Sequence, residues 1–175
     1  MEKRIKKMKK ISIIGPESSG KTTLAIFLSK ILQGIYVNEY ARDYLNKNKT
    51  YTINDLDIFA FKQTEIINIA SKTENDFLFA DTSVFVIEIW SILKYKKLSK
   101  SIKTLSEKEN FDCYLLCKPD IPWKWDRQRE NPNDRIKIYN TYKNLLSTRN
   151  YNYTVISGKL NQRIKSSLNF IIQIL

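Results

Sequence analysis

Gly15-Pro16-Glu17-Ser18-Ser19-Gly20-Lys21-Thr22 is the stretch that decides the fold of this 175-residue sequence. It matches the spacing G-x-x-x-x-G-K-[ST], in which glycines let successive backbone N–H groups turn inward around a phosphate. The stretch follows a short apolar run with strand character, Ile11–Ile14, and leads into a segment with helical periodicity. A phosphate-binding loop requires this strand–loop–helix context. We therefore predict a P-loop at this position.

The side chains of the loop indicate a nucleoside triphosphate as ligand, and we expect ATP with Mg²⁺ as cofactors. In such a loop the lysine, here Lys21, reaches the β- and γ-phosphates, and the hydroxyl of Thr22 ligates Mg²⁺. The N-terminus of the following helix adds a partial positive charge. The predicted nucleotide-binding residues are Gly15, Pro16, Glu17, Ser18, Ser19, Gly20, Lys21, Thr22 and Thr23, with Arg135 and Arg163 from later in the chain.

The remainder of the chain alternates between short strand-like runs and helical stripes. The predicted strands are Ile11–Ile14, Ile35–Val37, Phe77–Ala80 (ending at Asp81), Cys113–Cys117 and Tyr153–Ile156. Such alternation is typical of a parallel sheet covered by helices on both faces. We predict an α/β protein with a single-domain, three-layer P-loop NTPase fold over residues 11–175, preceded by a basic N-terminal extension at residues 1–10.

Helical periodicity marks the segments between the strands. A stripe from Thr22 to Gln33 predicts a helix that Gly34 ends in a left-handed conformation. Asn54 is the expected N-cap of a longer helix, whose stripe holds one polar residue and comprises Leu56, Phe59, Ala60, Gln63, Ile66, Ile67 and Ala70. Further helices are expected after Asp81 through Trp90, from about Asp134 to Thr148, and along Ile164–Leu175. Lys94–Lys103 and Lys118–Asn133 are predicted surface loops.

Composition excludes several kinds of site. The chain has no histidine, so Ser-His or Cys-His nucleophiles and imidazole zinc ligands are absent. Its two cysteines, Cys113 and Cys117, lie on one strand too far apart to bridge, which predicts buried free thiols. No apolar run approaches the length of a membrane span or a signal-peptide core, so we expect a cytoplasmic protein without a membrane partner. The net charge of +12 is mostly lysine, which favours a solvated surface over nucleic-acid binding.

The remaining features favour a small-molecule kinase over other P-loop proteins. The sequence contains no guanine-reading N-K-x-D string and no large insertion of the kind that mechanical ATPases carry. Three of its seven arginines, Arg127, Arg129 and Arg135, fall within nine residues of a proline-bearing loop. We predict a lid at about residues 119–135, in which Arg127 and Arg129 act catalytically by stabilising charge on the transferring phosphoryl group.

Two carboxylates follow strands whose carboxyl ends meet at the P-loop edge of the predicted sheet. Glu39 comes just after Ile35–Val37, and Asp81 ends the next strand. We expect Asp81 to serve the metal ion and the acceptor hydroxyl, while Glu39 and Arg42 hold the acceptor. Which of the two carboxylates accepts the hydroxyl proton stays open.

Aromatic residues near the same edge supply a surface for a flat ring. They are Tyr36, Tyr40, Trp90, Trp123 and Trp125. Aromatic faces stack on planar ligands. Tyr40, Trp90 and Trp123 are the acceptor-binding candidates, and which of them stacks on the acceptor ring stays open.

Several of these strings together resemble the ribosylnicotinamide kinase module of NadR-type NAD-salvage proteins. The resemblance extends from about Lys10 to Arg163. It rests on residues 15–25, on Val37-Asn38-Glu39-Tyr40-Ala41-Arg42-Asp43-Tyr44-Leu45, on Asp81-Thr82, and on Tyr114-Leu115-Leu116-Cys117-Lys118-Pro119-Asp120-Ile121-Pro122-Trp123. It implies a five-stranded parallel sheet of the nucleoside-kinase type. It also implies ATP-dependent phosphorylation of nicotinamide riboside to nicotinamide mononucleotide.

One string departs from the family pattern. Where the family has a more acidic, glycine-bearing lid, this chain has Lys124-Trp125-Asp126-Arg127-Gln128-Arg129. The adenylyltransferase and DNA-binding functions of the longer relatives are not expected of this chain. Another nucleoside or nucleotide kinase, such as a deoxynucleoside kinase, and a regulatory or nucleic-acid-associated P-loop ATPase stay open as alternatives. The oligomeric state is also open, a homo-oligomer included.

Overall fold

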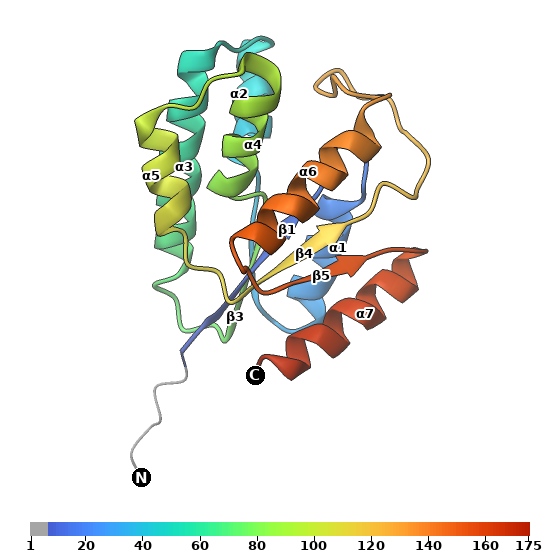
Figure 1. The fold of residues 1–175 in the computed structure, drawn as a ribbon. Coiled ribbons are helices and arrows are strands. Elements are labelled where there is room, and N and C mark those ends of the chain that lie inside the picture. The colour runs from blue at the N-terminus through green and yellow to red at the C-terminus, as the bar shows by residue number, and fades with distance from the viewer. Residues whose placement is uncertain (1–6) are drawn as a thin grey trace.

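Five parallel strands form the centre of the computed structural model, which describes residues 7–175 (Figure 1). The strands are β1 (Lys9–Ile14), β2 (Ile35–Val37), β3 (Phe77–Asp81), β4 (Cys113–Cys117) and β5 (Tyr153–Ile156). They are arranged in the order β2-β3-β1-β4-β5. The chain therefore reverses its direction of winding at β1, which creates a crevice at the carboxyl end of that strand. The predicted α/β fold with five parallel strands is confirmed.

Seven helices cover the two faces of this sheet. They are α1 (Lys21–Ile31), α2 (Tyr40–Asn48), α3 (Ile53–Ala70), α4 (Val84–Tyr95), α5 (Lys100–Lys108), α6 (Arg135–Thr148) and α7 (Leu160–Gln173). On one face α1 and α7 pack against the strands, and on the other face α3, α4 and α6 do so. The small helices α2 and α5 lie against α3 and α4. None of the described helices is long and apolar enough to cross a membrane.

Alternate residues of the buried strands supply the two cores. Ile11, Ile13 and Phe79 face α1 and α7, while Ile14 and Leu116 face α4 and α6. This two-sided burial explains why the strands read as continuous apolar runs. Cys113 and Cys117 are buried and unbridged, as predicted. Burial raises the pKa of the Cys117 thiol to about 11 and keeps it uncharged.

The predicted ends of several elements need correction. Strand β1 begins at Lys9, so the last two residues of the expected N-terminal extension belong to the sheet, while residues 1–6 lie outside the described part. Helix α3 begins at Ile53 and is capped at Thr52 rather than at Asn54. The Asp55 carboxylate accepts hydrogen bonds from the Thr52 N–H and hydroxyl, at 2.7 and 2.8 Å.

Two helices were missed. The predicted surface loop at Lys94–Lys103 is wrong, because α5 starts at Lys100 after Ser99 accepts a hydrogen bond from the Ile102 N–H at 3.1 Å. Ile102 is only 1% exposed, so tertiary packing stabilises this lysine-rich helix. Helix α2 starts directly after Glu39, in a stretch where the sequence predicts ligand-binding residues but no helix. Both helices are nine residues long, and helices of this length are only marginally stable without tertiary packing.

The turn after α1 also differs from the prediction. Gln33, with φ of 49°, adopts the left-handed conformation that was expected of Gly34. Gly34 is required for a different reason, because a Cβ atom there would lie 2.8 Å from both the Cβ and the carbonyl oxygen of Phe77. The glycine thus permits β2 to approach β3 closely.

We expect Gly34→Ala to lower the free energy of unfolding by about 1–3 kcal/mol, the usual cost of forcing atoms into a packed site. Gln33→Gly is the matched control, because a glycine adopts the left-handed turn without steric cost and should not destabilise the protein. Urea unfolding of the two variants measures both effects. Equal stability of Gly34→Ala and wild type would contradict this account of the β2–β3 approach.

Candidate nucleotide and acceptor site

A cleft of about 530 Å³ opens at the carboxyl end of the sheet. The whole P-loop and the start of α1 line one side of it, residues 15–23. Glu39 and Arg42 line it from the β2–α2 segment, and Trp90 lines it from α4. The β4–α6 loop, residues 118–134, contributes Arg129. The fold thus brings the predicted phosphate-binding residues and several predicted acceptor-binding residues to one cavity.

The P-loop is held by hydrogen bonds within the loop and by close packing against β4. The Ser19 hydroxyl and the Lys21 ammonium donate to the Pro16 carbonyl oxygen at 2.7 and 2.9 Å. Gly15 passes so close to β4 that a Cβ atom would lie 2.6 Å from the Cys117 carbonyl oxygen. The loop therefore has little freedom to collapse or to move away from the sheet.

Arg163 from α7 ties the P-loop to two other segments. Its guanidinium, only 3% exposed, donates to the carbonyl oxygens of Gly158 at 2.7 Å, Ser19 at 2.9 Å and Lys118 at 3.0 Å. It also pairs with the Asp120 carboxylate. Arg163 was predicted to bind the nucleotide, and in the structure its donors hold the backbone around the nucleotide side of the cleft.

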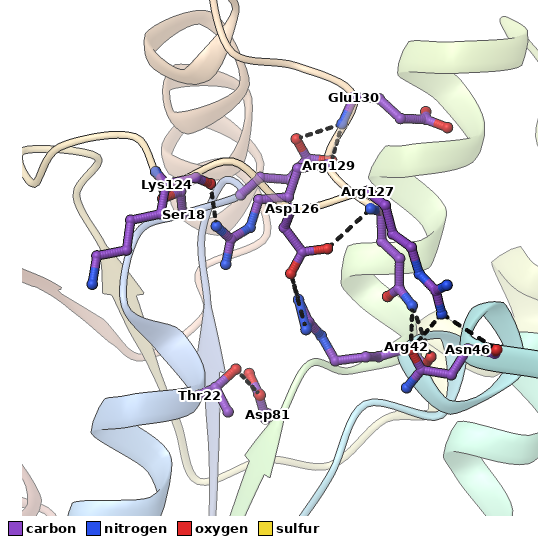
Figure 2. Close-up of polar contacts among 12 residues, drawn as sticks. Ser18, Thr22, Arg42, Asn46, Asp81, Lys124, Asp126, Arg127, Arg129 and Glu130 are labelled. Carbon is purple, nitrogen blue, oxygen red and sulfur yellow. Dashed lines mark hydrogen bonds and ion pairs between the residues drawn. The ribbon is translucent and has the colours of Figure 1, made fainter. Parts of the chain in front are cut away.

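Asp81 lies directly beside the P-loop (Figure 2). The Thr22 hydroxyl donates to Asp81 Oδ2 at 2.5 Å, and the Tyr36 hydroxyl lies 3.4 Å from the same oxygen. Oδ1 of this carboxylate, which is 2% exposed, has no hydrogen-bond partner among the described residues. Burial raises the pKa of Asp81, which the Lys21 ammonium opposes. The two predicted metal-binding residues are thus adjacent, and one buried carboxylate oxygen is available.

Glu39 lines the cleft and is the other carboxylate that the sequence predicts for the site. Burial, with a smaller contribution from the nearby charge of Asp81, raises the pKa of Glu39 to about 7. The cations of Lys21 and Arg42 oppose this shift. Two carboxylates with raised pKa values at the same edge are typical of sites that move protons.

The β4–α6 loop contacts α2 on one side of the cleft. Arg42 donates to Asp126 Oδ2 through both terminal nitrogens, at 3.1 and 3.3 Å (Figure 2). Arg127 donates to the side chain of Asn46 at 3.2 Å, and Gln128 donates to the same side chain at 2.9 Å. The loop thus holds the helix that carries the predicted acceptor-binding arginine.

The same loop contacts the P-loop on the other side. The Lys124 N–H donates to the Ser18 hydroxyl at 2.9 Å, and the Glu130 N–H donates to the Glu17 carboxylate at 3.0 Å. Arg135, at the start of α6, donates to the Ser18 carbonyl oxygen at 2.9 Å. Arg129 donates to the Lys124 carbonyl oxygen and lines the cleft. The loop therefore bridges the two halves of the cavity.

The aromatic candidates separate into different places. Trp90 lines the cleft, and its indole N–H donates to the Tyr51 hydroxyl at 2.9 Å. The ring of Tyr40 packs against Phe59 in the α2–α3 core. Trp123 lies beside the guanidinium groups of the loop, with Arg135 at 5.8 Å from its ring centre. Trp125 is 83% exposed.

Sequence reasoning missed other residues of the cleft. Glu130 accepts hydrogen bonds from Lys94 at 2.8 Å and from the Tyr51 hydroxyl at 3.0 Å, which joins the loop to α4. Lys137 and Tyr142 line the cavity from α6. No local motif marks these positions, because only the packing of α4 and α6 directs them to the cavity.

Fold and site together define a P-loop nucleotide-binding protein of the kinase type. The model of the family described as AAA domain matches residues 10–163. The chain belongs to this family.

The curated relatives are the trifunctional NAD biosynthesis/regulator proteins NadR of Salmonella typhimurium (strain LT2) and Escherichia coli (strain K12). Each is 26% identical over 150 residues, which cover 82% of this chain and 37% of the relative. The chain therefore spans little more than a third of their length. The resemblance to NadR is confirmed, and the chain has a P-loop fold of the kinase type and is related to NadR.

Solved structures share the fold. A crystal structure of NadR in complex with NR has a TM-score of 0.83 at 18% identity and covers 98% of this chain and 50% of its own. NadR in complex with NAD and AMP-PNP has a TM-score of 0.82 at 17% identity, with 96% and 50% covered. Thymidylate kinase from Candida albicans has a TM-score of 0.71 at 16% identity, with 95% and 92% covered.

The raised pKa of Glu39 predicts a pH-dependent stability. The folded protein binds the Glu39 proton more tightly than the unfolded chain does. The stabilisation that this protonated side chain contributes is complete below about pH 4.5 and is lost as the pH rises through about 7. We expect Glu39→Gln to gain stability relative to wild type across this window, on the order of 1–3 kcal/mol.

Urea unfolding at several pH values in a buffer with a chelator of divalent cations measures this difference. Glu65→Gln is the control, because that carboxylate pairs with Lys62 at the surface and its side chain is 42% exposed. A difference between Glu39→Gln and wild type that stays constant over the pH range would contradict the burial of the Glu39 charge.

Proposed function

We propose that this protein phosphorylates the ribose 5′-hydroxyl of nicotinamide riboside with ATP, giving nicotinamide mononucleotide and ADP. The observation that carries the proposal is the contact between Asp81 and Thr22 of the P-loop, which lines the same cleft as Glu39, Arg42 and Trp90. The relatives named for NAD biosynthesis, and the NadR structures with NR and AMP-PNP, support this choice of substrates.

The geometry supports a direct transfer between the two ligands. The 5′-oxygen of the acceptor bonds to the γ-phosphorus, the bond from that phosphorus to the bridging β–γ oxygen breaks, and ADP leaves. The hydroxyl proton passes to a carboxylate at the sheet edge, for which Asp81 Oδ1, without a hydrogen-bond partner in residues 7–175, is suited. Lys21 and Arg129 line the cleft and stabilise the charge on the transferring group.

Thr22 and Asp81 also fit the magnesium ion that accompanies ATP. The Thr22 hydroxyl and the Asp81 oxygen in contact with it, Oδ2, are hard oxygen donors. Mg²⁺ is usually held by one or two protein oxygens together with phosphates and water. When bound, it supplies electrostatic neutralisation of the phosphate oxygens.

The acceptor side is assigned to Glu39, Arg42 and Trp90. Arg42 and Glu39 offer a donor and an acceptor for ribose hydroxyls, and the indole of Trp90 offers a face for a cationic ring. Tyr40 and Trp123 remain candidates for an indirect role in acceptor binding, through the residues that they contact. Tyr40 packs in the α2–α3 core, and Trp123 lies beside Arg135 at the start of α6.

The β4–α6 loop is proposed to act as the lid of the site. It contacts Arg42 and Asn46 of α2 through Asp126 and Arg127, and it contacts the P-loop through Glu130. Closing this loop over both ligands excludes water, which otherwise competes with the acceptor hydroxyl.

A nucleoside monophosphate kinase is the second candidate. Lys94, Lys96 and Lys137 line the cleft, and these cations suit an acceptor that carries a phosphate. The similarity to thymidylate kinase, which extends over 92% of that chain, points the same way.

A panel of acceptors with Mg·ATP separates the two candidates. We expect ADP release and a product heavier by one phosphoryl group with nicotinamide riboside, and little turnover of thymidine, thymidine monophosphate or other nucleosides. Lys21→Met is the control and should lower kcat/KM roughly 10²- to 10³-fold, the usual loss when one charge-stabilising group is removed, while thermal unfolding stays near wild type. Preferred turnover of a nucleoside monophosphate would favour the second candidate.

A further inference from the structure

Gln63 is the one polar side chain in the apolar stripe of α3, and it is only 1% exposed. Its amide makes three hydrogen bonds, all to backbone groups. Oε1 accepts from the Tyr40 N–H at 2.9 Å, and Nε2 donates to the carbonyl oxygens of Asn38 at 3.2 Å and Thr82 at 3.4 Å. Both N–H groups of the amide are therefore used, and no other uncharged side chain of this length supplies the same set.

These three partners surround the two carboxylates of the site. Asn38 and Tyr40 are the neighbours of Glu39 on either side, and Thr82 directly follows Asp81. The ladder hydrogen bonds between β2 and β3 have ended before this point, since Val37 is the last paired residue of β2. A single buried side chain thus joins the two strand ends beyond the last pairing of the strands.

The backbone of Thr82 shows why such a support is needed. Thr82 has φ of 86°, a conformation that is strained for a β-branched residue. It lines the cleft, and its N–H donates to the Ile13 carbonyl oxygen at 3.3 Å. Strained residues persist when surrounding contacts hold them, and they concentrate at functional sites. The hydrogen bond to the Ile13 carbonyl holds the N–H group of Thr82, and the hydrogen bond from Gln63 holds its carbonyl group.

We propose that Gln63 is a positioning residue for phosphoryl transfer, which sets the placement of Glu39 relative to Asp81 through the backbone of Asn38, Tyr40 and Thr82. This inference rests on the proposed function, because it assumes that the acceptor lies between these carboxylates and the P-loop. Gln63 does not line the cleft, so it acts without touching the ligands.

Gln63→Met tests the role, since methionine fills a similar volume without a matching donor or acceptor. We expect kcat to fall about 10- to 100-fold, because small displacements of reacting groups have effects of this size. The acceptor KM should rise, since Glu39 and Arg42 follow the displaced segment. The KM for ATP should change less than the acceptor KM, because Pro16 and Arg163 hold the P-loop through contacts that do not involve Gln63.

The rise in acceptor KM distinguishes positioning from simple loss of folded protein, which lowers kcat alone. Nucleotide-binding stoichiometry by calorimetry gives the folded fraction of each variant. Ile67→Val is the control on the same helix, since Ile67 is buried in the apolar cluster that contains Val37, Leu78 and Ala80, and both Michaelis constants of this variant should match wild type.

If Gln63→Met does not fold, Gln63→Asn takes its place, because it keeps the amide and shortens its reach by one methylene. The proposal is overturned if the folded variant has a kcat and an acceptor KM within about twofold of wild type. Wild type that does not phosphorylate nicotinamide riboside would refute the proposed acceptor instead. The same comparison of variants would then be made with the acceptor from the panel that wild type does convert.

Discussion

The parallel pairing of β1 with β3 is the constraint on which the site depends. In its register Ile13 lies opposite Asp81, so the strand that enters the P-loop and the strand that ends in a carboxylate stop at the same level. The contact of 2.5 Å between Thr22 and Asp81 follows from this register. A slip of one residue would turn the Asp81 side chain to the opposite face of the sheet, because side chains alternate along a strand. Glu39 depends on the same edge through the pairing of Val37 with Ala80.

Beyond the ends of the strands, buried polar side chains replace the sheet as the support of the backbone. Arg163 donates to carbonyl oxygens of the P-loop, the β4–α6 loop and the β5–α7 turn. Gln63 does the same for the two segments that carry Glu39 and Asp81. Buried backbone groups require partners, and an amide or a guanidinium satisfies several of them at once. The P-loop and the segments that carry Glu39 and Asp81 are thus held by the same physical means.

The β4–α6 loop contacts both α2 and the P-loop. The structure shows how residues of this loop are used. Asp126 pairs with Arg42, and the backbone at Glu130 binds the Glu17 carboxylate. These contacts connect α2 to the P-loop, so a ligand that moves one of them acts on the other. Such coupling suits a reaction in which both substrates must be enclosed together.

The sequence by itself determined the P-loop, the five strands, the parallel α/β class and the buried free cysteines. Each of these depends on a local pattern: a motif with fixed spacing, an apolar run or the spacing of two cysteines along one strand. Only the tertiary structure decided that Gln33 rather than Gly34 adopts the left-handed turn, that α5 forms from a lysine-rich segment, and that Gln63 reaches both strand ends. These features arise from groups far apart in the chain, because the space beside Phe77 and the approach of the Gln63 amide to the Thr82 carbonyl exist only after the layers have packed.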